Sequence, residues 1–391
     1  AVAVEEGGGA CRVTGLGRPR PFQLEAPASR PTIARTERGM VVSWVDNHLD
    51  PRERQAFTVL LDGSMRRKSL PIAVTPEAHN VRQPQLLGVG NRLVLVFWDE
   101  TGKDPGVYVR LLDSEGKIQS PPRKLSSARK AGYPTLTAAP NGDLWAVWEE
   151  DFENAGADIV ARRLGPELEP RGEAVRLTRL LQPRNGSSEA RTPDAVVAHG
   201  ALQIVFAKAL APKRVQIMMQ SVALDDPLLA EGLPAKRRKS KRGEKKEPDD
   251  EYLGVLRPVS VPSGKKAEPH ISCTNQGCFI AWEEEKAGAV AAYVDREKGP
   301  LWHRAFSRKG SRPSVSKDDH SAVVAWFEDS RLRLAPMSRD GIGKPSTLSK
   351  VSGFQPNPDL SRGERPGQWY IAFRDFESAH LEAFTLRAEC R

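Results

Sequence analysis

The sequence predicts an all-β fold, a seven-bladed β-propeller of four-stranded antiparallel blades that is closed by an N-terminal strand completing the last blade. Three observations predict it: a pattern that recurs seven times, a nearly constant spacing within each copy, and a strand-like segment near the N-terminus that the last copy lacks. The chain has 391 residues, of which 39% are hydrophobic, and no stretch approaches ~20 consecutive apolar residues. These values exclude global disorder and a membrane-spanning helix.

Each copy of the pattern contains a proline, an alternating apolar stretch, a turn and a second apolar strand that ends in an aromatic residue. The separation from proline to aromatic residue is 13 to 15 residues in the pairs Pro31 and Trp44, Pro84 and Trp98, Pro134 and Trp148, Pro193 and Phe206, Pro269 and Trp282, Pro313 and Trp326, and Pro358 and Phe373. Six copies carry an acid two positions later, namely Asp46, Glu100, Glu150, Glu284, Glu328 and Asp375, whereas the fourth copy carries Lys208. Five of the six spacings between aromatic positions are 44 to 58 residues, near the length of a four-stranded blade.

Several second strands are apolar on both faces, as in 92–98 (RLVLVFW), which suits a strand buried between two neighbouring blades. The seventh copy lacks the short fourth strand that closes the other copies. The segment 20–25 (RPFQLE) precedes Pro31 by the linker length that follows the sixth copy, so we expect it to supply the missing outer strand and to close the ring. Residues 1–17 are then an N-terminal extension, and residues 18–391 are one propeller domain.

With this pattern the chain resembles the bacterial β-propeller repeat proteins of the sialidase-like and TolB-like group, over roughly residues 18–391. The resemblance implies the propeller fold and is poorly specific for any activity. The Ser-x-Asp-x-Gly-x-Thr-Trp boxes of sialidases are missing from the sequence, and none of its five Tyr lies in a recognisable constellation.

The four cysteines fit this architecture as two pairs. Cys273 and Cys278 flank a tight hairpin in the fifth copy, where opposite arms reach the short distance that a disulfide needs. Cys11 and Cys390 come together if the N-terminal strand pairs with the final strand, and that bond would lock the ring shut. Two disulfides predict an oxidising, extracytoplasmic compartment, which is periplasmic, cell-surface or secreted. The alternative for the hairpin is a metal site with His270 as third ligand, although no fourth ligand is evident.

The spacing of 76 residues before the fifth aromatic position predicts an insertion in blade four, at about 230–250, which we expect to be disordered. Residues 236–250 hold eight basic and four acidic groups, in a chain whose net charge is +9. This basic run begins with Lys236, Arg237, Arg238 and Lys239, and it is a candidate for binding an acidic partner or an anionic envelope polymer. No aromatic residue is interleaved with the charges, so nucleic-acid binding is not expected.

The main functional prediction is a non-enzymatic scaffold for protein interaction, or a subunit of a cell-envelope assembly. The repeated acids are expected to be structural, because an active site is normally unique and these acids recur in nearly every blade. Motifs for a serine nucleophile elbow, a zinc-protease helix and a P-loop are missing, so we expect no enzyme activity, no cofactor and no metal. The candidate partner surface lies in blade four and comprises Lys208, Met218, Met219 and the basic run.

Two alternatives stay open. The first is a carbohydrate-binding or sialidase-like, glycan-active propeller, with acids, Trp and Arg gathered at one mouth of the channel; a glycosidase of this kind needs two carboxylates, one with a raised pKa. His270 follows a repeat proline and is the His best placed to line the channel. The second is polyanion binding through the basic run. A loop calcium site at Asp46, Asn47 and Asp50 lacks the EF-hand pattern.

Overall fold

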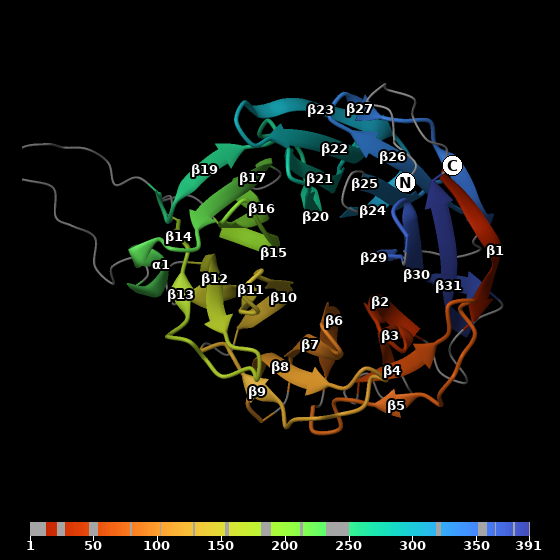
Figure 1. Ribbon diagram of the computed structural model, residues 1–391. Coiled ribbons are helices and arrows are strands. Elements are labelled where there is room, and N and C mark those ends of the chain that lie inside the picture. Colours follow the sequence, from red (N-terminus) through yellow and green to blue (C-terminus); the bar gives the residue numbers. More distant parts are fainter. Residues whose placement is uncertain are drawn as a thin grey trace, which may run out of the picture.

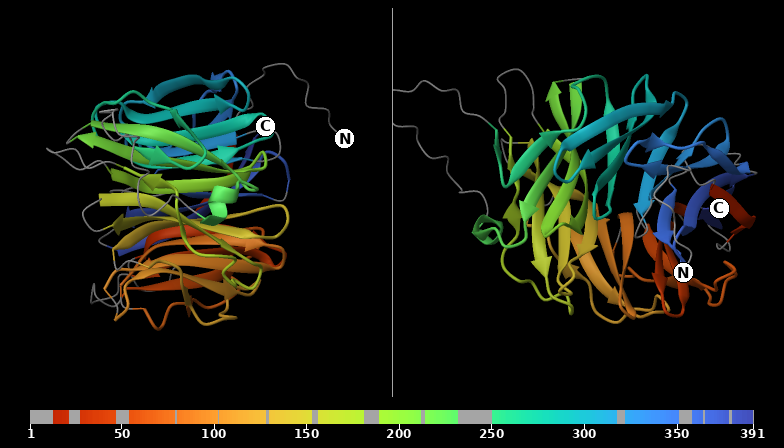
Figure 2. Two further views of the ribbon diagram at one scale, coloured as in Figure 1. Left: turned by 90° about the vertical axis from the view of Figure 1, so that its left-hand side faces the viewer. Right: turned by 45° about the horizontal axis from the view of Figure 1, so that its top comes forward.

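The computed structural model describes residues 13–390 except 22–27, 47–53, 79, 102, 128–129, 153–155, 181–188, 212–213, 232–249, 318–321, 351–357, 364 and 378–379. For residues 13–21, 28, 230–231, 349–350, 374–377 and 380–390 it describes the backbone alone. The fold is an all-β propeller of antiparallel sheets, and Figure 1 shows these sheets arranged around a central opening. In the views of Figure 2 the strands run roughly along the axis of the ring.

The strands take four positions from the axis outward. The innermost strands are β2 (Ala28–Thr36), β6 (Val81–Val89), β10 (Ala131–Ala138), β15 (Glu189–Ala198), β20 (Lys266–Cys273), β24 (Ser311–Lys317) and β29 (Asp359–Arg362). The second strands are β3 (Gly39–Asp46), β7 (Arg92–Asp99), β11 (Leu144–Phe152), β16 (Ala201–Ala211), β21 (Gly277–Glu284), β25 (Ala322–Phe327) and β30 (Gln368–Glu377). The third strands are β4 (Gln55–Leu61), β8 (Gly106–Leu112), β12 (Gly156–Leu164), β17 (Arg214–Ala223), β22 (Gly288–Asp295), β26 (Arg331–Ser338) and β31 (His380–Cys390).

The outer strands are mostly short. They are β5 (Ile72–Ala73), β9 (Arg123–Lys124), β13 (Val175–Arg176), β19 (Val255–Pro258), β23 (Gly299–Ser307), β27 (Gly341–Ile342) with β28 (Ser346–Lys350), and β1 (Val13–Pro21). A separate two-stranded sheet pairs β14 (Thr178–Arg179) with β18 (Glu251–Tyr252), and one short helix, α1, spans Pro227–Glu231.

Six sheets have four antiparallel strands, rather than the seven that the sequence predicts. The sheet from β24 to β28 has five strands, because β27 and β28 both pair with β26. They pair with different stretches of it, since Gly341 lies opposite Ser338 and Lys350 lies opposite Arg331. The two short strands therefore share one edge of β26.

The N-terminal strand pairs with the last strand of the chain. β1 is antiparallel to β31, with Val13 opposite Cys390, and Figure 1 shows the two side by side. This strand spans Val13–Pro21, so it begins before the segment 20–25 in which the missing outer strand is expected, and it overlaps that segment at Arg20 and Pro21. The boundary of an N-terminal extension at residue 17 stays a prediction. At the axis, β29 of this last sheet contacts β2 of the first.

Apolar layers between neighbouring sheets form the core. Most repeat aromatic residues pack against the preceding sheet: Trp148 clusters with Val94 and Val109, and Trp282 clusters with Val205. Trp98 instead packs against Tyr133 of the following sheet. Trp148 and Trp282 are fully buried. Because both faces of a second strand meet such a layer, apolar residues occupy both faces of its central part, as the sequence predicts for 92–98.

The predicted insertion in blade four falls almost entirely on residues 232–249, which lie outside the described residues, as do Lys236, Arg237, Arg238 and Lys239. In the described part of the chain, no helix is long and apolar enough to cross a membrane.

Candidate functional site

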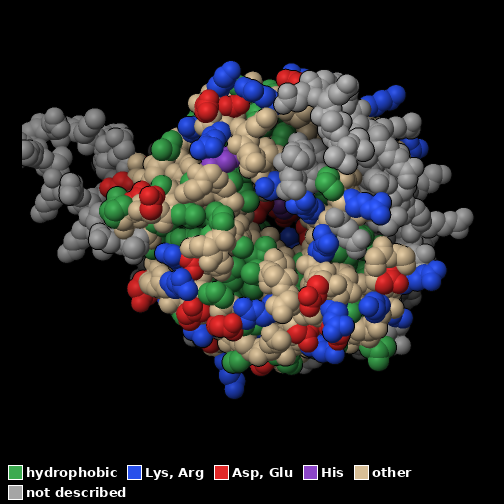
Figure 3. Space-filling model, in the orientation of Figure 1, with side chains coloured by type: hydrophobic (Ala, Val, Ile, Leu, Met, Phe, Trp, Pro, Cys, Tyr) green, Lys and Arg blue, Asp and Glu red, His purple; other side chains and the backbone are tan. Residues whose placement is uncertain are grey.

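The seven innermost strands enclose a central pocket of about 170 Å³. In five of the sheets, both neighbours of the repeat proline line it: Arg30 and Thr32, Gln83 and Gln85, Tyr133 and Thr135, Thr192 and Asp194, and Glu268 and His270. Arg312 and Asp359 complete the polar lining from the last two sheets. Figure 3 shows the opening on one face, with basic and acidic side chains gathered at its rim and inside it. We call this site the central pocket.

In six sheets a β-bulge lies at the repeat proline, and the residue before that proline lines the central pocket. In the first sheet Ser29 lies opposite Val45 and Thr32 opposite Ser43, so two residues of β2 are left without a partner. The same shift occurs in the sheets of β6, β10, β15, β20 and β24. The residue before the proline takes a φ between 44° and 51° at Arg30, Gln83, Tyr133, Thr192, Glu268 and Arg312. Such φ values are uncommon outside glycine, and repeated strain of this kind is typical of functional sites.

Acids next to the repeat tryptophans hold this strained backbone. Glu149 Oε2 accepts a hydrogen bond from the N–H of Thr192 at 2.7 Å, and Glu283 Oε2 accepts one from the N–H of Arg312 at 3.0 Å. Each acid belongs to the sheet that precedes the bulge it supports. These two bulges are therefore held by acids that do not line the pocket. The side chains that precede the prolines line it instead.

An ion triad spans the central pocket. Glu268 from β20 pairs with Arg312 from the next sheet, and its other oxygen lies 3.5 Å from Arg30 of the first sheet. Burial opposes ionisation of Glu268, but the two guanidinium groups outweigh it, so the pKa of Glu268 is lowered. Tyr133 lies in the same electrostatic neighbourhood, and burial together with Glu149 and Glu268 raises the pKa of its hydroxyl.

The residues after the prolines join neighbouring sheets. Thr32 Oγ1 accepts a hydrogen bond from the N–H of Leu86 at 3.2 Å, and Gln85 Oε1 accepts one from the N–H of Leu136 at 2.7 Å. Asp194 and Asp359 do the same, since Asp194 Oδ2 accepts from Ile271 at 2.9 Å and Asp359 Oδ2 accepts from Ile33 at 2.8 Å. These four side chains therefore connect neighbouring sheets by hydrogen bonds at the axis of the ring.

His270 and Asp359 have shifted pKa values in this pocket. Burial disfavours the charged imidazole of His270, but Asp194, whose Oδ2 lies 3.6 Å from Nδ1, and the nearby Glu268 and Asp359 raise its pKa overall. Burial raises the pKa of Asp359 despite its hydrogen bond from Ile33. The pocket thus contains one carboxyl with a raised pKa, Asp359, and one with a lowered pKa, Glu268.

The repeat acids lie elsewhere and bind neighbours in the wall. Glu150 accepts hydrogen bonds from Trp148 Nε1 at 2.6 Å and from Ser127 Oγ at 2.5 Å. Glu284 accepts from Trp282 Nε1 at 3.2 Å and from Ser263 Oγ at 2.7 Å. Glu328 accepts from Ser307, and Glu100 accepts from Asn80 and Arg82. None of these four acids lines the central pocket. The side chain of Asp375 lies outside the described residues.

The repeat aromatic residues are buried at Trp44, Trp148, Phe206, Trp282, Trp326 and Phe373. Trp98 is half-buried and packs against Tyr133, with ring centroids 6.3 Å apart. A Cβ on Gly132 would lie 3.2 Å from the Trp98 ring, so this close approach requires the glycine.

The candidate partner surface in blade four is not an open surface. Met218 and Met219 are 5% and 7% exposed, because they pack in the layers on the two faces of β17. Lys208 pairs with Asp250 at 2.6 Å and lies over the ring of Tyr252. The lysine that replaces the repeat acid therefore anchors the chain that returns from the insertion. This corrects the sequence-based interpretation of these three residues.

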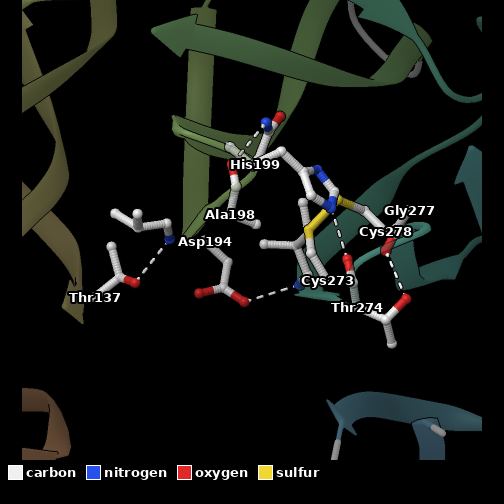
Figure 4. The surroundings of a disulfide bond; sticks show 11 residues. Thr137, Asp194, Ala198, His199, Cys273, Thr274, Gly277 and Cys278 are labelled. Carbon is white, nitrogen blue, oxygen red and sulfur yellow. Dashed lines mark hydrogen bonds between the residues drawn. A yellow bond between two sulfur atoms is a disulfide. The ribbon is translucent and has the colours of Figure 1, made fainter. Parts of the chain in front are cut away.

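The hairpin cysteines form the disulfide Cys273–Cys278, with Cα atoms 4.0 Å apart (Figure 4). Both sulfurs are thus engaged, and His270 belongs to the central pocket, which removes the ligands of the alternative metal site. Groups of three or more metal-binding side chains do not occur in the described part of the chain. Cys11, Asn47 and Asp50 lie outside the described residues, and the side chain of Cys390 is not described.

The sequence analysis identified one polar residue of the central pocket, His270, and none of the other polar residues that line it. The signal was present, because the two neighbours of each repeat proline occupy equivalent positions in every copy. Their residue types vary, so a search for a repeated residue could not detect them.

Neither the protein-family models nor the curated proteins contain a match to the chain. Among solved structures, a protein of unknown function from Dyadobacter fermentans is 12% identical with a TM-score of 0.53, covering 98% of this chain and 99% of that one. A polysaccharide lyase is 10% identical with a TM-score of 0.53, covering 92% and 89%. The neuraminidase-like protein of a flat-faced bat isolate from Peru is 8% identical with a TM-score of 0.48, covering 97% and 94%. At these identities the likeness shows the fold alone.

The comparison contradicts the prediction that the chain is not an enzyme. That prediction rested on a ring of repeats without a known catalytic motif. The polysaccharide lyase is an enzyme whose fold resembles this one over most of both chains, so such a ring is no evidence against catalysis.

Proposed function

We propose that the chain is a glycan-active protein that binds carbohydrate in the central pocket and cleaves a glycosidic bond there. The observation that carries this proposal is the pair of carboxyl groups whose pKa values are shifted in opposite directions, Asp359 upward and Glu268 downward. Glycoside hydrolysis needs such a pair, with one protonated carboxylic acid and one carboxylate. The polysaccharide-degrading neighbour supports this alternative over a scaffold role.

In the proposed reaction Asp359, whose pKa is raised, acts as the acid that donates a proton to the leaving glycosidic oxygen. The Glu268 carboxylate takes a proton from a water molecule, whose oxygen bonds to the anomeric carbon as the glycosidic bond breaks. One water is consumed and two sugar hydroxyl groups are formed. Arg30 and Arg312 keep Glu268 ionised, and Tyr133 and Gln83 offer an aromatic face and an amide to the sugar.

A second candidate is elimination from a uronate-containing polysaccharide, as in a polysaccharide lyase. The arginines favour it, because Arg30 and Arg312 could neutralise the uronate carboxylate in place of Glu268. Elimination leaves an unsaturated sugar and consumes no water, so the products distinguish the two reactions.

The test is a panel of neutral and acidic polysaccharides, with release of reducing ends as the readout and ultraviolet absorbance as the sign of an unsaturated product. We expect Asp359→Asn and Glu268→Gln to lower kcat by about 10²-fold or more, since each removes a proton-transfer group while keeping the shape of the side chain. Asp329→Asn and Glu167→Gln are matched controls at exposed positions outside the pocket. Wild-type turnover in either pocket variant, or the failure of every polysaccharide to bind, contradicts the proposal.

We also propose that the five-stranded sheet counts as a seventh blade and that β1 closes the ring, in a protein that works outside the cytoplasm. The shared edge of β27 and β28, the pairing of β1 with β31 and the Cys273–Cys278 disulfide support this. Polyanion binding by the basic run stays a prediction.

A further inference from the structure

A second cavity, of about 220 Å³, lies between the sheet of β15 to β19 and the sheet of β20 to β23. It shares no lining residue with the central pocket. Its walls include Gln203 on β16, Met219 on β17 and Arg257 on β19 from one sheet, and Cys278 on β21 and Arg296 after β22 from the other. We call it the inter-blade cavity.

Two guanidinium groups of this cavity have no counterion. Within the described residues, Arg257 and Arg296 make no side-chain hydrogen bond or ion pair, whereas Arg30 and Arg312 of the central pocket both pair with Glu268. The acid in the same wall, Asp295, forms an ion pair with Arg339 at 3.1 Å and accepts hydrogen bonds from the N–H groups of Glu297 and Lys298. Among the described residues, no acid neutralises these two charges of the cavity wall.

The two arginines are brought to the same side of the cavity. Arg257 extends from the outer strand β19 to the turn between β22 and β23, where a Cβ on Gly299 would lie 3.8 Å from its Nη1. Arg296 belongs to this same turn. Because both arginines line one cavity, an anion bound in it would neutralise both charges at once.

A buried amide oxygen also lacks a partner here. Gln203 is 5% exposed, and its Oε1 accepts no hydrogen bond in the described structure. Its Nε2 donates only a long bond, 3.4 Å, to Ala198 O. Buried amide oxygens are nearly always paired, so this one points to a donor supplied by a ligand or a water. Met219, Val255 and Val294 provide apolar walls beside it.

A hydrogen bond between the two sheets fixes the rim of the inter-blade cavity. His199, in the turn between β15 and β16, bonds through Nε2 to Thr274 O at 2.6 Å, and Figure 4 shows it beside the Cys273–Cys278 disulfide. Because the turns of two sheets are tied together at this point, the cavity does not depend on a ligand to keep its shape.

We propose that the inter-blade cavity is a second binding site, which takes a small oxyanion carried by a hydroxylated molecule, with Arg257 and Arg296 on the anion and Gln203 on a hydroxyl. The oxyanion is a carboxylate, a sulfate or a phosphate, because each accepts the planar fork of a guanidinium.

The experiment is titration calorimetry of the full chain with gluconate, inorganic sulfate and inorganic phosphate, in separate runs at matched ionic strength. Calorimetry is preferred to thermal shifts, because sulfate and phosphate stabilise many proteins without a site. We expect at least one probe to bind, and Arg257→Gln and Arg296→Gln each to weaken its affinity about tenfold or more. Arg123→Gln is the matched control, since Arg123 is an exposed arginine on the outer strand of another sheet, opposite Val109 as Arg257 is opposite Met219.

Three results overturn the proposal: none of the probes binds the wild-type chain, both cavity variants bind as the wild type does, or Arg123→Gln weakens binding as much as they do. Arg296 is exposed in a turn, so its replacement tests the site even if Arg257→Gln fails to fold.

Discussion

Tryptophan indoles carry a buried hydrogen bond in some blades of this ring and not in others. Trp148 Nε1 donates to the buried Glu150, whereas Trp326, which is 2% exposed, has an Nε1 that finds no partner in the described part of the chain. Both rings fill an inter-sheet layer of the same kind, so the two residues differ mainly in this bond.

Trp148→Phe should therefore lower the free energy of unfolding more than Trp326→Phe does. We expect a difference of about 1–3 kcal/mol, because the buried Glu150 loses a donor that its charge makes valuable. Denaturant unfolding of the two variants measures it. Equal losses of free energy in the two variants would mean that the volume of the ring, and not the hydrogen bond, explains why an aromatic residue recurs at this position.

The pH dependence of stability at His270 follows from the sign of its pKa shift. Its pKa is raised in the folded protein, mainly by Asp194 acting against burial, so the fold binds a proton more tightly than the unfolded chain does. The stabilisation is complete below the unfolded pKa of 6.5 and is lost as the pH rises through the higher folded value. The stability difference between wild type and His270→Gln should shrink over that range.

Urea unfolding of both proteins across this pH range checks the prediction. A difference that grows as the pH rises would mean that His270 is held in its neutral form.

At the scale of the elements, the β-bulges at the prolines are the distinctive feature. Thr192 has a φ of 51°, which is strained for a β-branched residue, and its buried Oγ1 has no hydrogen-bond partner among the described residues. Glycine adopts this φ without strain and has no hydroxyl to satisfy.

Thr192→Gly should therefore raise the free energy of unfolding by about 1 kcal/mol, although glycine normally weakens a strand. Thr347→Gly, at an exposed position of strand β28, is the control and should be destabilising. Thermal or denaturant unfolding of both variants shows whether each change raises or lowers the free energy of unfolding. Destabilisation by both would argue that the bulge is unstrained.

The strand elements were largely predictable from sequence, and the pocket was not. Apolar runs such as 92–98 mark buried strands by themselves, and the spacing of Cys273 and Cys278 suffices for a hairpin disulfide. By contrast, Arg30, Glu268 and Arg312 meet only because three bulges far apart in the chain face one axis. A local sequence pattern cannot show that three residues so far apart in the chain come together. The burial of Met218 and Met219 was also missed, because a strand between two sheets has no exposed face.

At the scale of the whole molecule, the two ends of the chain meet in one sheet. Val13 lies opposite Cys390, two residues from Cys11, so the predicted bond between Cys11 and Cys390 is compatible with the backbone register. We expect peptide mapping under non-reducing conditions to find this bond. We expect Cys11→Ser to lower the free energy of unfolding by about 5 kcal/mol in the loop-entropy account.

Two free terminal thiols in oxidised protein would contradict that expectation. The control is the double variant Cys273→Ala with Cys278→Ala, which opens a much shorter loop and should lower stability by only about 2 kcal/mol.

The bulges at the prolines also separate the chemistry of the central pocket from the pairing of the strands. The residue before each proline has no ladder partner in six sheets, so the pairing of strands does not dictate its identity. An exchange at one of these positions alters the chemistry of the central pocket and removes no pair of the strand ladder. Six sheets thus share one framework while Arg, Gln, Tyr, Thr and Glu occupy the position before the proline.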